Sequence, residues 1–125
     1  MGMIRQFRCP SCRAAWELHT GHGMRHGVLG RVMEAFSEEI REEIAKEARG
    51  GRLPLFRFDY RAAVCRQCRM VTAVPVLSLM EREKSYVGGC PRCGAQAEIL
   101  DEDRPVRCPE CQKEDLEMKV TGHWD

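Results

Sequence analysis

The sequence Cys90-Pro91-Arg92-Cys93-Gly94 holds two cysteines separated by two residues, with proline after the first cysteine and glycine after the second. A turn of this kind, called a knuckle below, can direct both sulfur atoms to one point. The proline fixes the turn, and the glycine tolerates a positive φ after it. This stretch therefore predicts half of a four-thiolate metal site.

Working outward, the same spacing of two cysteines occurs three more times, as Cys9-Pro10-Ser11-Cys12, Cys65-Arg66-Gln67-Cys68 and Cys108-Pro109-Glu110-Cys111. These three knuckles are followed by Arg13, Arg69 and Gln112, where a positive φ would be mildly strained. Each knuckle supplies two ligands, so four knuckles predict two sites. The expected ligands are Cys9, Cys12, Cys65, Cys68, Cys90, Cys93, Cys108 and Cys111.

Two zinc ions are the expected cofactors, because zinc favours a tetrahedron of thiolates in structural sites. The chain shows no secretory leader and no apolar stretch long enough to span a membrane, which predicts a cytoplasmic protein with no membrane partner. In that reducing compartment, paired cysteines favour metal over disulfides. Iron in a rubredoxin-like site is the alternative, with Phe7, Trp16 and Tyr60 as candidates for the aromatic residues near it.

The pairing of the knuckles has two solutions. Between Cys93 and Cys108 there are 14 residues, which fits one short ribbon, and the first knuckle would then join the second. We expect this sequential pairing. The alternative is nested, with the first knuckle joining the last, and it stays open because the cost of closing a loop grows slowly with its length.

The regions between the knuckles predict a small α+β fold. Apolar residues recur every three or four positions between residues 28 and 49, which predicts a helix with a break near Ser37. Residues 53–64 and 70–80 are predicted strands, and Pro75 favours an edge or bent strand. We therefore expect two four-cysteine zinc ribbons, with rubredoxin-like knuckles on antiparallel β-hairpins and a helical insert between the first two knuckles. The expected units are residues 1–89 and residues 90–125, packed as one.

This order of features resembles small uncharacterised bacterial proteins with tandem zinc-ribbon knuckles, including the CpXC-type domains. The resemblance rests on the four knuckles, the acidic helix after the first one and the apolar strand after the second. It implies bound zinc and a bacterial cytoplasmic setting, and it implies no particular reaction. The sequence departs from the pattern at Arg66, where proline is usual.

We expect a binding protein and not an enzyme, because closed zinc sites leave no position for a substrate and the chain has no nucleophile–base pair or phosphate loop. The leading hypothesis is an adaptor that contacts another, unidentified protein. Nucleic-acid binding through a basic N-terminal ribbon is the alternative, but the net charge of +1 and the acidic last third weigh against it. Its candidate residues are Arg8, Arg13, Arg61, Arg66 and Arg69.

Three histidines cluster in the glycine-rich loop before the predicted helix, at His19, His22 and His26. One hypothesis is a third, open metal site or an acid/base centre, which would make the protein a metal sensor or an enzyme. The other is a solvated loop. It is favoured because no Asp or Glu except Glu17 lies near the three histidines in the sequence.

Overall fold

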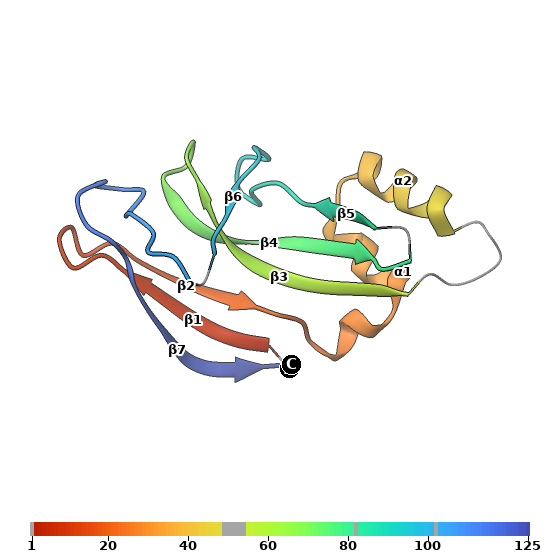
Figure 1. The fold of residues 1–125 in the computed structure, drawn as a ribbon, viewed down its shortest axis with the longest axis horizontal. Coiled ribbons are helices and arrows are strands. Elements are labelled where there is room, and N and C mark those ends of the chain that lie inside the picture. Colours follow the sequence, from red (N-terminus) through yellow and green to blue (C-terminus); the bar gives the residue numbers. More distant parts are fainter. Residues whose placement is uncertain (1, 49–54, 82, 102) are drawn as a thin grey trace.

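The structure is a computed structural model that describes residues 2–48, 55–81, 83–101 and 103–125 (Figure 1). It has two antiparallel sheets and a few short helices, so the prediction of a small α+β fold is confirmed. One sheet has the strand order β2-β1-β7 and the other β5-β4-β3-β6.

The first sheet combines strands from both ends of the described chain. β1 (Gly2–Arg8) and β2 (Ala15–Thr20) form a hairpin around the first knuckle, with Arg8 opposite Ala15. β7 (Glu117–Trp124) pairs with the other side of β1, with an irregularity between Ile4 and Arg5. Figure 1 shows the three strands side by side. β1 is therefore the centre of this sheet.

The second sheet is built on a hairpin around the second knuckle. β3 (Phe56–Cys65) and β4 (Met70–Leu79) pair along their whole length, which confirms the two predicted strands over the described residues. Residues 53 and 54 of the first prediction lie outside the described residues. β5 (Lys84–Val87) borders β4, and β6 (Glu98–Ile99) borders β3.

β4 is not an edge strand, so the expectation drawn from Pro75 is wrong in that respect. The pairing of β4 with β5 begins at Val76, one residue after the proline, so no ladder bond requires the missing N–H. The carbonyl of Pro75 still accepts a bond from the N–H of Gly88 at 2.9 Å. A Cβ on Gly88 would lie 2.6 Å from Pro75 Cγ, so glycine permits this close approach.

The predicted helix over residues 28–49 is interrupted, and residue 49 lies outside the described residues. η1 (Met24–Gly27) precedes this segment, which begins with α1 (Leu29–Val32) and η2 (Met33–Ala35). Phe36 is then extended, and α2 (Glu38–Ala48) begins after Ser37, whose Oγ accepts the Ile40 N–H at 3.4 Å. The break near Ser37 is thus confirmed.

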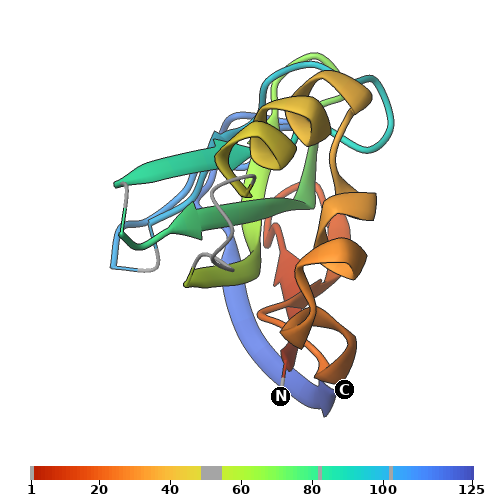
Figure 2. The same ribbon diagram turned by 90° about the vertical axis from the view of Figure 1, so that its right-hand side faces the viewer.

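Two apolar clusters hold these layers together. Val32, Phe36 and Ile44 of the helical segment pack with Phe58 and Leu77 of the second sheet. Figure 1 shows the helices at one end of the molecule beside that sheet, and Figure 2 looks onto that end. A second cluster joins Phe7 and Leu18 of the first sheet to Val64 and Val71 of the second. The two sheets also meet through a backbone bridge between Gly21 and Tyr60, whose two bonds are 2.7 and 2.8 Å long.

Candidate metal centres

The structure gathers the eight cysteines into two groups of four. The outer cluster contains Cys9, Cys12, Cys108 and Cys111, and the inner cluster contains Cys65, Cys68, Cys90 and Cys93. Within each cluster all four sulfur atoms lie within 4.8 Å of one another. Two groups of knuckle cysteines with this spacing fit tandem zinc-binding knuckles.

The sulfur distances match a metal-centred tetrahedron. The sulfurs are 3.6 Å apart in Cys9 and Cys111, 3.7 Å apart in Cys12 and Cys108, and 3.5 Å apart in Cys65 and Cys93. A tetrahedron with metal–sulfur bonds of about 2.3 Å has edges of about 3.8 Å. A disulfide would need about 2.05 Å. Each cluster could therefore hold one metal ion.

The sequential pairing expected from the sequence is wrong, and the nested pairing is the one observed. The outer cluster joins the first knuckle to the last because β7 pairs with β1 and returns the end of the chain to its beginning. The inner cluster joins the second knuckle to the third. The 14 residues after Cys93 do not close a ribbon of their own, since β6 pairs with β3 instead. The division of the chain at residues 89 and 90 stays a prediction.

The backbone of the knuckles repeats closely. The residue after the second cysteine has a positive φ in all four, at Arg13 (63°), Arg69 (54°), Gly94 (77°) and Gln112 (59°). Its N–H donates to the carbonyl of the first cysteine at 2.8–3.0 Å in three knuckles, those that begin at Cys9, Cys90 and Cys108. Three side-chain-bearing residues thus occupy the conformation that glycine adopts at lowest cost.

Each knuckle buries its first cysteine and leaves the second nearer the surface. Cys9, Cys65, Cys90 and Cys108 are buried, whereas Cys12 and Cys93 are exposed and Cys68 and Cys111 are half-buried. The buried sulfurs lie away from solvent, so they contact the other sulfurs of the cluster and accept hydrogen bonds from nearby backbone N–H groups. The N–H groups of Cys12 and Cys68 approach the sulfurs of Cys9 and Cys65 at 3.4 Å.

Without a metal, each cluster has one acidic and one strongly basic sulfur. The Cys68 N–H, with the other thiols of the inner cluster, lowers the pKa of Cys65 to about 7. The thiol of Cys93, desolvation and the remaining thiols raise the pKa of Cys68 to about 12. In the outer cluster, the Lys113 N–H helps to lower the pKa of Cys111 to about 7. The pKa of Cys12 rises to about 12, because desolvation and three neighbouring thiols outweigh a backbone hydrogen bond at Ala14.

The five arginines considered for nucleic acid are exposed and divided between the clusters. Arg8 and Arg13 flank the outer cluster, whereas Arg66 and Arg69 flank the inner one. Arg61 lies in the middle of β3, and Arg66 is paired with Glu98 at 3.1 Å. The first two knuckles do not share a cluster, so these arginines do not lie on one ribbon.

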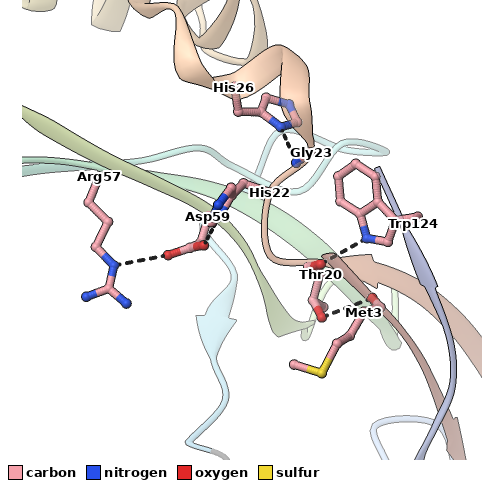
Figure 3. A network of polar contacts seen from close by, with 8 residues as sticks. All are labelled: Met3, Thr20, His22, Gly23, His26, Arg57, Asp59 and Trp124. Atoms are coloured by element: carbon pink, nitrogen blue, oxygen red, sulfur yellow. Dashed lines mark hydrogen bonds and ion pairs between the residues drawn. The ribbon is translucent and has the colours of Figure 1, made fainter. Parts of the chain in front are cut away.

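Each of the three loop histidines has a defined contact, and Figure 3 shows those of His22 and His26. His22 Nδ1 lies 2.9 Å from Asp59 Oδ1, and His26 Nδ1 accepts the Gly23 N–H at 2.8 Å. His19 stacks on Trp124 at 5.7 Å. Within the described part of the chain, the groups able to hold a metal are the two cysteine clusters, and the histidines are in neither.

Sequence reasoning missed two residues beside these histidines. Asp59 comes from a strand 37 positions away from His22, so local sequence gave no signal for the pair. Trp124 lies at the end of the last strand and reaches the loop through the pairing of β7 with β1. Its presence as one of two tryptophans in the chain was the available signal.

Comparison with known proteins gave no match to a family model, to a curated protein or to a solved structure. The resemblance to CpXC-type proteins therefore has the paired cysteine clusters as its support. Among the described residues, no helix has the length and apolar character needed to cross a membrane.

Proposed function

We propose that this protein binds two structural zinc ions and serves as a cytoplasmic protein-interaction module. The observation that carries the zinc sites is the set of sulfur separations of 3.5–3.7 Å, close to the edge of a zinc–thiolate tetrahedron. Four thiolates fill the coordination of each ion, so neither ion would have a position for a substrate or a reactive water.

The cofactor is tested by native mass spectrometry with elemental analysis of the purified protein. We expect two zinc ions per chain. Replacing Cys108, a buried ligand of the outer cluster, by alanine should leave one ion, and replacing the exposed Glu110 of the same knuckle by glutamine should leave two. Iron with a rubredoxin-like absorbance, or zinc below one ion per chain, would contradict the proposal.

The interaction role is supported by apolar side chains left exposed on an outer strand. β7 is the last strand of its sheet among the described residues, and Met118 and Val120 on it are 43% and 46% exposed. Edges of sheets and exposed apolar groups are surfaces on which other chains dock. The zinc ion of the outer cluster would keep this edge rigid, because Cys108 and Cys111 precede β7 and Arg8, next to Cys9, pairs with Glu117 at its start.

The test is quantitative cross-linking and capture of partners from cytoplasmic extract. Met118→Glu with Val120→Glu should remove a specific partner that the parent protein captures. Lys119→Glu, an exposed charge change on the same strand, should retain it. Equal capture by all three proteins would refute the interaction role of β7.

Nucleic-acid binding is the alternative function, and we find no observation that favours it over protein binding. It predicts an affinity that falls steeply with salt and is lost when Arg61, Arg66 and Arg69 are replaced by alanine.

A further inference from the structure

A groove of about 680 Å³ lies between β2 and β4, near the end of β7. Residues from five separate elements contribute to its walls, including Glu17, His19, His26, Tyr60, Trp124 and Asp125. None of the cysteines is among the described residues that line the groove, and Pro91 of the third knuckle is one of those residues. The proposed zinc sites make no use of it.

Four of these residues place aromatic rings around the groove. Trp124 stacks with His19 at 5.7 Å and an interplanar angle of 25°, and it meets His26 edge-on at 6.0 Å. His26 in turn contacts Tyr60 at 5.6 Å. Tyr60, His26 and Trp124 are half-buried and His19 is exposed, so part of this ring cluster reaches solvent.

The rings are fixed before any ligand arrives. Trp124 Nε1 donates to the carbonyl of Thr20 at 2.9 Å, and His26 is held by the Gly23 N–H, as Figure 3 shows. A Cβ on Gly2 would lie 2.2 Å from Trp124 Nε1, so the indole is packed tightly against that backbone. A site with immobilised aromatic side chains loses little conformational entropy when it binds.

The charged groups of the groove are acidic. Glu17 and Asp125 contribute carboxylates, and no lysine or arginine is among the described residues that line it. The chain as a whole has 20 basic and 19 acidic residues, so the absence of lysine and arginine from the described lining is local and not a matter of composition. Aromatic faces with carboxylates beside them attract a cation and repel a phosphate.

We propose that this groove binds an arginine side chain of a partner protein. A guanidinium is flat, stays charged and can stack on an aromatic ring while its N–H groups donate to a carboxylate such as Glu17. The inference rests on the proposed interaction role and adds to it a second place of contact, besides the edge of β7, and the chemistry of the partner.

The test uses zinc-loaded protein and two peptides that differ in one charge. N-acetyl-Ala-Ala-Arg-Ala-Ala-amide is titrated while the two indole N–H resonances are followed by NMR, with Trp16→Phe used to assign them. The control peptide carries citrulline, the neutral isostere of arginine. We expect the Trp124 resonance to move when the arginine peptide is added. The protein should bind the citrulline peptide at least about fivefold more weakly, which is the factor for about 1 kcal/mol of cation–π attraction.

Variants locate the binding. Glu17→Gln should weaken the binding of the arginine peptide by about fivefold. Glu42→Gln, an exposed change on α2, should leave that binding unaltered. Equal binding of both peptides, or no shift of Trp124 with either, would overturn the arginine site. Neither result bears on partner capture through β7, so failure of this inference is distinguishable from failure of the proposed function.

Discussion

Removing one cysteine from each cluster tests both the nested pairing and its energetic consequence. Cys90 and Cys108 are a matched pair, because each is the buried first cysteine of a Cys-Pro knuckle and they belong to different clusters. We expect Cys90→Ala and Cys108→Ala each to lose one zinc and the double variant to lose both. In Cys9→Ala with Cys108→Ala, both changes fall in the outer cluster, so one zinc should remain.

The two single variants should also differ in stability. The outer cluster links residues 102 positions apart (Cys9 and Cys111), and the inner cluster links residues 28 apart (Cys65 and Cys93). If a metal link acts on the unfolded chain as a covalent link does, its stabilisation grows as 1.5RT times the logarithm of the loop length. The outer link is then worth about 1 kcal/mol more than the inner one. That corresponds to about 4 °C in Tm for a chain of this size.

The assay is zinc counting by native mass spectrometry together with urea unfolding of both variants at matched zinc. Cys108→Ala should unfold at lower urea than Cys90→Ala. One zinc remaining in the double variant Cys90→Ala with Cys108→Ala would refute the nested pairing. If the double variant loses both zinc ions but Cys90→Ala is more destabilising than Cys108→Ala, the nested pairing stands and only the loop-length reasoning is refuted.

Three further predictions follow from local geometry. Arg13→Gly should stabilise the protein by about 1 kcal/mol in urea unfolding, because Arg13 has a φ of 63°; Arg92→Gly, at a position without positive φ, should bring no gain. Gly88→Ala should destabilise by about 1–3 kcal/mol, since its Cβ would lie 2.6 Å from the ring of Pro75, and an unchanged Tm would contradict that contact. Zinc affinity should fall as pH falls from 8 to 6. The raised pKa of Cys12 and Cys68 keeps these thiols protonated, so the metal must displace their protons to bind. A chelator competition in which the zinc affinity does not change with pH would contradict this prediction.

The sequence was sufficient to predict the knuckles because their chemistry is local. A knuckle is defined within five positions by the spacing of its cysteines, its proline and the residue that follows. That last residue has a positive φ both at Gly94 and at Arg13. The strands on either side of the second knuckle were equally local, since the turn at Cys65-Arg66-Gln67-Cys68 sets their register.

The pairing of the knuckles could not be predicted in the same way. Loop-closure entropy changes slowly with length, so a spacing of 14 residues hardly distinguishes one partner from another. The partner of each knuckle is determined by the pairing of β1 with β7 and by the packing of the two sheets. In that packing, Phe7 and Leu18 contact Val64 and Val71. The position of Trp124 against the histidine loop depends on the same ladder.

The nested arrangement also orders events during synthesis of the chain. The inner cluster has all its ligands once Cys93 leaves the ribosome, whereas the first knuckle must wait for Cys108, 96 positions after Cys12. At about 5–20 residues per second, the knuckle of Cys9 and Cys12 spends roughly 5–20 s as an unfinished two-thiolate site. Zinc loading should therefore proceed from the inside outward, and the first cysteines made are the last to be completed.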